Sequence, residues 1–225
     1  MQDWWHEYSG DIIWCGFGAA VLIGYHLFLA IRVRQNPNFT VQSVNRKARR
    51  SWVQNIMAEP SHAILGVQTL RNSTMAATFF ASTSVILSMG VLSLTGQADE
   101  IAQDWHTLNL FGSRHPGLWQ LKLIVLLADL LIAFFSFAMS VRLYNHVGFQ
   151  VSLPPQLRPA AVDPEQVAAH LNRAGSFYSA GMRAYYLAVP LVFWLFGPHL
   201  MAVASLLLVS MLYFMDRMPP VAAED

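Results

Sequence analysis

The stretch Pro60–Gly96, PSHAILGVQTLRNSTMAATFFASTSVILSMGVLSLTG, decides the fold of this chain. It carries a single charge, Arg71, and has none from Ser73 to Thr95, which is long enough to cross a bilayer. Small residues recur in it at helical spacing and share one helix face: Ser73, Ala77, Ala81, Ser84 and Ser88. In lipid, such a face lets two helix backbones approach closely. The stretch therefore predicts a transmembrane helix over about 73–95 that packs against other helices. The plainer alternative is a weakly hydrophobic span whose hydroxyl groups have no packing role.

The composition indicates an integral membrane protein. Of the 225 residues, 55% are hydrophobic and 12% are charged, whereas a soluble domain has about 25% charged residues. The net charge of +1 favours no nucleic-acid partner. The single cysteine, Cys15, excludes an intrachain disulfide. No basic segment precedes the first apolar block, so we expect a retained span there and not a cleaved signal peptide.

The apolar blocks predict a single all-α domain over residues 1–217 with a short tail at 218–225. The last block is too long for one span, and Gly197-Pro198 divides it. The five predicted spans are about 12–31, 73–95, 118–141, 177–196 and 199–215, with a cytoplasmic loop at 142–174. Within that loop, Asp163-Pro164 predicts the start of a short surface helix. The first span has its own small-residue face, made of Gly16, Ala20 and Gly24.

Residues 40–59 are too polar to span and predict a basic amphipathic helix capped by Thr40. An apolar stripe with a cationic flank is typical of an interfacial helix that lies among anionic lipid headgroups. A helix packed against the cytoplasmic ends of the spans has the same pattern, and the sequence leaves both alternatives open. The residues predicted to contact headgroups are Arg46, Lys47, Arg49, Arg50 and Trp52.

The distribution of basic residues predicts the orientation. With the amino terminus outside and the carboxyl terminus cytoplasmic, only Arg114 and Lys122 fall on the outer side. Twelve basic residues fall inside, and we therefore expect this orientation in a bacterial inner membrane: Arg32, Arg34, Arg46, Lys47, Arg49, Arg50, Arg71, Arg142, Arg158, Arg173, Arg183 and Arg217.

Asp129 is the sharpest chemical candidate because it lies near the middle of a predicted span. A carboxylate there costs roughly 3 kcal/mol to insert and normally faces protein or water. It is either a proton or cation site in a path between helices, or a protonated group that bonds to hydroxyls of the second span. Lys122 lies seven residues earlier on the same face, about 10 Å along the axis, and we expect it to snorkel outward.

Arg71, Asn72 and Arg183 lie near the inner ends of their predicted spans. Either arginine is placed to bind a lipid phosphate, to pair with an acidic residue, or simply to anchor the topology. Two histidines facing each other would bind haem b, and His26 with His62 or His146 is the pairing to consider. We predict no cofactor, no metal site and no catalytic residues, because no metal-ligand, nucleophile or phosphate-loop spacing occurs.

Three stretches carry a resemblance to a known family. They are Arg50-Ser51-Trp52-Val53 with Met57, the run from Gln68 to Ala77 continuing to Phe80-Ala81-Ser82-Thr83, and Arg183-Ala184-Tyr185-Tyr186 with Pro190 and the turn Trp194–Pro198. Together the chain resembles the membrane-protein family catalogued as domain of unknown function 599, from the first span to Asp216. The resemblance implies a small multi-span membrane protein without an agreed activity. It singles out Arg71, Asn72, Arg183 and Gly197-Pro198.

The sequence thus predicts a non-enzymatic membrane interaction protein, either a homo-oligomer or an accessory subunit of a larger assembly. Its expected partners are membrane lipids with anionic headgroups, and copies of itself or other membrane chains. The alternatives are a small-solute or ion transport protein that uses Asp129 and a haem-binding electron-transfer protein.

Overall fold

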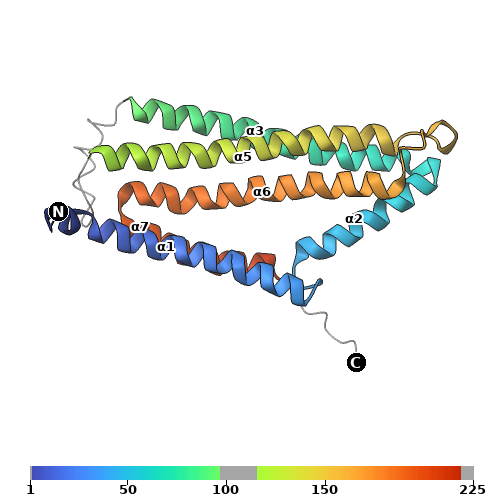
Figure 1. Cartoon of the computed structure of the whole chain (residues 1–225). Helices are drawn as coiled ribbons and strands as arrows, with labels where there is room; N and C mark the ends of the chain where they lie inside the picture. Colours follow the sequence, from blue (N-terminus) through green and yellow to red (C-terminus); the bar gives the residue numbers. More distant parts are fainter. Residues whose placement is uncertain (1, 97–115, 219–225) are drawn as a thin grey trace. The chain divides into compact units, whose positions relative to one another are not determined.

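The computed structural model describes residues 2–96 and 116–218, and within these ranges the regular structure is helical (Figure 1). This confirms the all-α fold class. The predicted loop at 97–115 and the tail from 219 onward lie outside the described residues. One-turn 3₁₀ helices occur at Pro60–His62 and Pro155–Leu157. The α-helices are α1 (Gln2–Gln35), α2 (Val41–Ala58), α3 (Ala63–Thr95), α5 (Pro116–Val151), α6 (Pro164–Phe196) and α7 (Pro198–Asp216).

Five of these helices are long and apolar enough to cross a membrane, and each contains one of the predicted spans. Large apolar side chains on them are exposed, among them Phe79, Ile86 and Phe214 at 67%, 68% and 79%. Exposed apolar surface on this scale is rare in soluble proteins, so we expect lipid to surround these side chains. The orientation of the bundle stays a prediction.

The polar segment predicted as a loop at 142–174 is mostly helical. α5 continues to Val151 and α6 begins at Pro164, so that only about a dozen residues connect them. The cap was predicted correctly: Asp163 Oδ2 accepts a hydrogen bond of 3.1 Å from the Glu165 amide. The predicted short surface helix and the predicted fourth span form one continuous helix, α6, because no proline lies between them. Pro190, further along, is buried and lies inside this helix.

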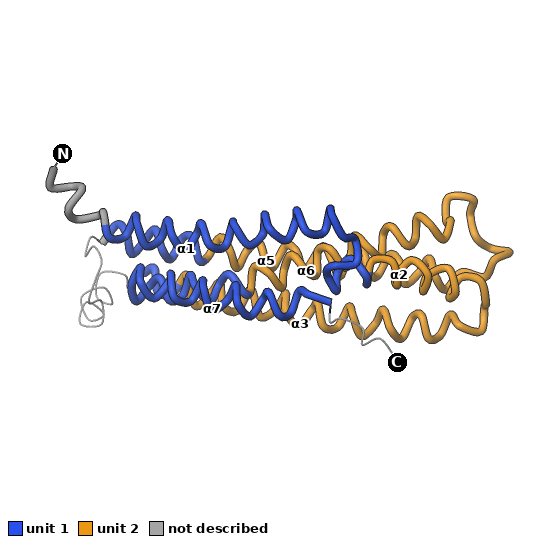
Figure 2. Tube along the Cα trace, turned by 90° about the horizontal axis from the view of Figure 1, so that it is seen from below, with its two compact units in different colours: residues 1–45, 93–126, 186–225 blue, residues 46–92, 127–185 orange. Residues whose placement is uncertain are grey.

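The chain divides into two compact units, which Figure 2 colours separately. In unit 1 (1–45, 93–126 and 186–225), α1 packs along α7. Gly18 makes this close approach possible, because a Cβ there would lie 3.2 Å from Ser205 Oγ. Two hydrogen bonds connect the carboxyl end of α7 to α1 and the segment that follows it. The Tyr25 hydroxyl donates to Asp216 Oδ2 at 2.7 Å, and the Met218 amide donates to the Phe39 carbonyl at 3.1 Å.

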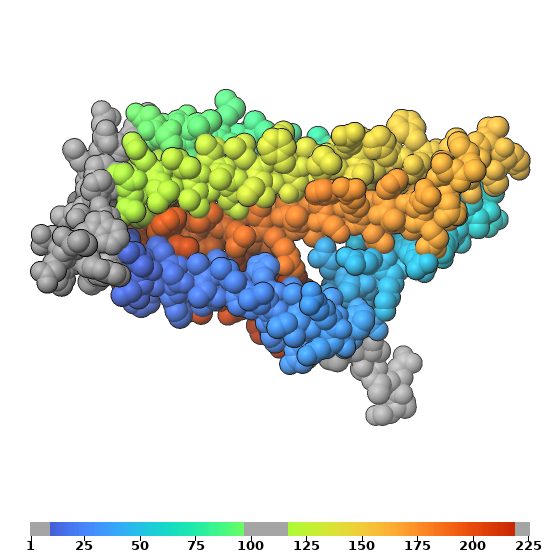
Figure 3. All heavy atoms as spheres, in the orientation of Figure 1, coloured from blue at the N-terminus to red at the C-terminus, as the bar shows by residue number. Residues whose placement is uncertain are grey.

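Unit 2 (46–92 and 127–185) contains most of α2, α3, α5 and α6. The apolar stripe of α2, Val53, Ile56 and Met57, is at most 5% exposed and belongs to one core with residues of all three longer helices. Of the two alternatives for residues 40–59, α2 therefore takes the second and packs on helices. In the space-filling view, α5 and α6 lie against each other in this unit (Figure 3).

A second core in unit 2 is aromatic. The Phe137 ring is completely buried and stacks on Phe80 with ring centroids 5.3 Å apart. Tyr185 contacts both rings and donates a hydrogen bond of 2.5 Å to the Phe80 carbonyl. This core joins α3, α5 and α6 around the small residues Ala77, Ala133 and Ala184.

Candidate functional site

A groove with a volume of about 560 Å³ lies between α3 and α5 of unit 2. Its walls are mostly apolar. The α3 side consists of Val67, Leu70, Arg71, Thr74, Met75 and Thr78. The α5 side consists of Tyr144, Asn145, Gly148, Phe149 and Ser152. A mostly apolar concave wall with a few polar groups is typical of small-molecule sites.

The polar side chains that line the groove include hydrogen-bond donors but no acidic residue. No carboxylate lines the groove, and neither Arg71 nor Asn145 has a hydrogen bond or ion pair within the described residues. Both side chains are exposed. The Thr74 and Thr78 hydroxyls, by contrast, donate to carbonyls one turn earlier in α3, at 2.9 Å each. The groove therefore presents one uncompensated positive charge over an apolar surface.

The other predicted residues at this end do not join the groove. Asn72 is exposed on α3 and does not line it, although it follows Arg71 in the chain. Arg183 is half-buried on α6, does not line the groove and makes a polar or electrostatic interaction elsewhere. Of the three polar residues singled out together by the sequence, only Arg71 belongs to the cavity.

Asp129 lies in the middle of α5, half-buried, with its Oδ2 enclosed by protein. No hydrogen bond reaches this carboxyl group from the described residues. Five hydroxyls of α3 donate instead to carbonyls of their own helix, at 2.9–3.2 Å: Ser73, Thr74, Thr78, Thr83 and Ser84. The Ser88 hydroxyl is buried and has no hydrogen bond to the described residues, Asp129 included. This geometry gives no support to a structural role for Asp129 through those hydroxyls.

Lys122 differs from the expectation that it snorkels outward. It belongs to unit 1 and is only 3% exposed, and its Nζ lies 5.7 Å from the centre of the Trp194 ring. Asp11, which is 6% exposed, is a buried acidic group whose charge acts on Lys122. A buried charge is tolerated where an opposite charge accompanies it. The sequence offered a signal in Asp11, the acidic residue next to the first span.

The two small-residue faces have different surroundings. On α3, Ala77, Ser84 and Ser88 are buried inside unit 2, and Ser73 and Ala81 are half-buried. On α1, Gly16, Ala20 and Gly24 are exposed, and a Cβ added at either glycine would meet nothing within 4 Å. The contact of α1 with α7 uses Gly18 instead, on another face of the helix. The α1 face is thus a close-packing surface left open in the described part of the chain.

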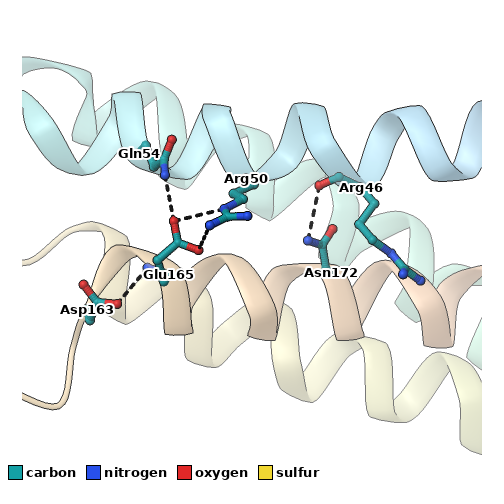
Figure 4. Close-up of polar contacts among 6 residues, drawn as sticks. All are labelled: Arg46, Arg50, Gln54, Asp163, Glu165 and Asn172. Atoms are coloured by element: carbon teal, nitrogen blue, oxygen red, sulfur yellow. Dashed lines mark hydrogen bonds and ion pairs between the residues drawn. The ribbon is translucent and has the colours of Figure 1, made fainter. Parts of the chain in front are cut away.

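Two of the four basic side chains of α2, those of Arg49 and Arg50, contact α6, and Figure 4 shows the contact of Arg50. Arg50 forms an ion pair of 2.7 Å with Glu165, to which Gln54 also donates. Asn172 accepts a hydrogen bond of 3.1 Å from Arg49 and donates one of 3.3 Å to the Arg46 carbonyl.

The guanidinium group of Arg49 also lies directly over Gly175 of α6, and this burial lowers its pKa. Trp52 is half-buried against the core of unit 2, and Arg46 and Lys47 are exposed. Headgroup contact by these five residues stays a prediction.

Sequence reasoning missed the partners of these groups. Glu165 and Asn172 are spaced seven residues apart, two helical turns, so that both face α2. Sequence reasoning also did not predict roles for Tyr185 and Asn145. A single polar residue in a helix does not indicate which residue of another helix it will face. Among the described residues, no group of three or more histidine, cysteine or acidic side chains is close enough to hold a metal ion.

The fold defines the class of this protein. It is an all-α membrane protein whose described residues form five long apolar helices and one shorter amphipathic helix, which packs on three of them. A family model described as a protein of unknown function, DUF599, matches residues 13–221, and the chain belongs to this family. The resemblance seen in the sequence is thereby confirmed. No curated protein and no solved structure matches the chain.

Proposed function

We propose that this chain is a non-enzymatic membrane interaction protein that assembles with a second copy of itself through α1. The observation that carries the proposal is the open face formed by Gly16, Ala20 and Gly24. Small residues four apart allow backbones to approach closely, and association in lipid depends on such packing. A two-fold axis along the membrane normal would bring the same face of two parallel α1 helices together.

The comparison with α3 supports this choice of face. The α3 small residues already contact other helices of the same chain, and Ala77 is completely buried. Replacing them would disturb the monomer first. The α1 face contacts no other helix in the part of the chain that the structure describes, and bulky residues there would leave the contact of Gly18 with α7 unchanged.

The test is the native mass in a mild detergent or a lipid nanoparticle. The proposal predicts a particle well above the 25.2 kDa of one chain. Gly16→Leu with Gly24→Leu should reduce it to one chain, whereas Gly90→Leu, an equally open glycine on α3, should leave it unchanged. A monomeric native protein, or an unchanged mass in the double variant, would overturn the proposal. A different co-purifying chain would instead support the accessory-subunit form.

The second candidate is small-solute or ion transport through Asp129. The enclosed carboxyl oxygen, which has no hydrogen-bond partner among the described residues, favours it, because a polar group in the membrane interior normally needs a partner or a function. In proteoliposomes that contain a pH-sensitive dye, Asp129→Asn should abolish potential-driven proton uptake, and Asp129→Glu should retain part of it. Undiminished uptake in Asp129→Asn would remove this residue from the mechanism.

The proposal includes the orientation with the amino terminus outside, in a bacterial inner membrane, and its support is the distribution of basic residues. Attachment of a reporter enzyme to the carboxyl terminus would test it, since an active periplasmic reporter there would contradict it. The proposal carries no cofactor. A Soret band in the purified protein would favour the haem alternative.

A further inference from the structure

We propose that the groove between α3 and α5 is a binding site for a phosphate-bearing amphiphile of the membrane, an anionic phospholipid in chemical class. Arg71 would hold the phosphate and the apolar wall an acyl chain. This inference is independent of the proposed assembly, because the groove lies in unit 2 and the α1 face in unit 1.

The charge of the groove specifies an anion. Arg71 supplies up to five N–H donors in a planar fork that matches phosphate, and nothing in the described chain compensates its charge. Asn145 on the facing helix adds a side-chain amide that has no hydrogen-bond partner within residues 2–96 and 116–218. Arginines of the same unit that serve a structural role look different: Arg50 pairs with Glu165, and Arg158 donates to the Leu153 and Met57 carbonyls.

The walls specify an amphiphile. Met75 and Phe149 are exposed by 63% and 76% and belong to the groove, next to the buried Leu70. Gly148 leaves open space, since a Cβ there would meet nothing within 4 Å. A free inorganic anion would gain nothing from this apolar surface, whereas an acyl chain gains about 0.8 kcal/mol for each buried methylene group.

The surface of α5 locates the groove at the edge of the membrane. Exposed residues of α5 are apolar at Ile132 and Phe135 and become polar at Arg142, Asn145 and His146. On α3, Phe79 is exposed two turns after Arg71. The positive charge thus lies at the level where headgroups replace hydrocarbon. Of the apolar lining, Met75 lies one turn from Arg71 toward the hydrocarbon, whereas Val67 and the exposed Phe149 lie on the other side of Arg71 and Asn145.

The experiment uses the full chain in nanodiscs of phosphatidylcholine alone or mixed equally with phosphatidylglycerol, and native mass spectrometry after mild extraction counts the retained lipids. The native protein should retain phosphatidylglycerol preferentially. Arg71→Gln should weaken this retention about 10–100-fold, the range for one charge-assisted hydrogen-bonding group. Arg142→Gln, which removes an exposed cation of α5 outside the groove, should not change it.

A second variant keeps the charge and fills the space. Gly148→Leu should reduce phosphatidylglycerol retention although Arg71 is intact, and an unchanged unfolding temperature would exclude misfolding as the cause. Equal retention by the native protein and Arg71→Gln would overturn the proposal. Displacement of the lipid by inorganic phosphate at comparable concentration, with no effect of Gly148→Leu, would overturn the amphiphile in favour of a free anion.

Discussion

Gly181→Ala tests the packing of the aromatic core most directly. A Cβ at this position of α6 would lie 2.8, 2.8 and 2.9 Å from three atoms of the Phe137 ring. The ring cannot move aside easily, because it is completely buried and packs against Phe80, Tyr178 and Tyr185. Either the ring or the helix must shift by several tenths of an ångström.

The expected magnitude follows from two opposing effects. Overpacking of a filled core by one methyl group costs about 1–3 kcal/mol. Alanine is itself better than glycine in a helix by roughly 0.5–1 kcal/mol. Gly90→Ala has the second effect without the first, because nothing lies within 4 Å of a Cβ there. Gly181→Ala should therefore be less stable than Gly90→Ala by about 1–3 kcal/mol.

The assay is reversible unfolding in mixed micelles with increasing denaturing detergent, monitored by circular dichroism. Adding Phe137→Leu to Gly181→Ala should recover part of the difference, because the smaller side chain relieves the contact. A Gly181→Ala protein as stable as Gly90→Ala would refute the close approach of α6 to Phe137.

Three further changes test individual contacts. Tyr185→Phe removes the donor to the Phe80 carbonyl and should cost about 0.5–1.5 kcal/mol of unfolding free energy, with Tyr186→Phe as control; equal stability of the two would contradict it. Tyr25→Phe removes the 2.7 Å bond to Asp216, and hydrogen exchange should rise at the carboxyl end of α7 while α3 stays protected; unchanged exchange would count against this tie. Gly175→Ala would displace the flexible Arg49 guanidinium, so the amide hydrogens of α2 should exchange faster with little loss of global stability. A large loss of global stability would show that the backbone moves and not the Arg49 side chain.

Helix caps could be predicted from the sequence because they depend only on residues close together in the chain. Thr40 Oγ1 accepts a hydrogen bond of 3.2 Å from the Ser43 amide, as a cap at this position predicts, and Asp163 acts in the same way for α6. The five spans followed from the length and apolarity of their blocks. Helix ends without such signals were not readable, and the continuation of α5 to Val151 is the clearest example.

The use of each helix face depends on contacts between distant segments, and there sequence reasoning was incomplete. Both small-residue faces had suitable spacing, yet Ala77 is enclosed and Gly16 is open. Gly18, which contacts α7, has no partner at spacing four and gave no signal. For Arg71, the sequence shows a charge near the end of a span, but the facing wall of α5, which completes the groove, is visible only in the structure.

The length of the helices explains why α2 packs on helices. α3, α5 and α6 have 33, 36 and 33 residues, which is about 50 Å each and exceeds the ~30 Å of hydrocarbon. The surplus lies at the end where the exposed surface turns polar, and there three helices alone would leave apolar side chains such as Val147 and Val167 in water. α2 covers them with Val53, Ile56 and Met57. A helix committed to this core has only its outer side left for headgroups. The groove on α3 and α5, where Arg71 has no partner among the described residues, is therefore the place that we propose for lipid recognition.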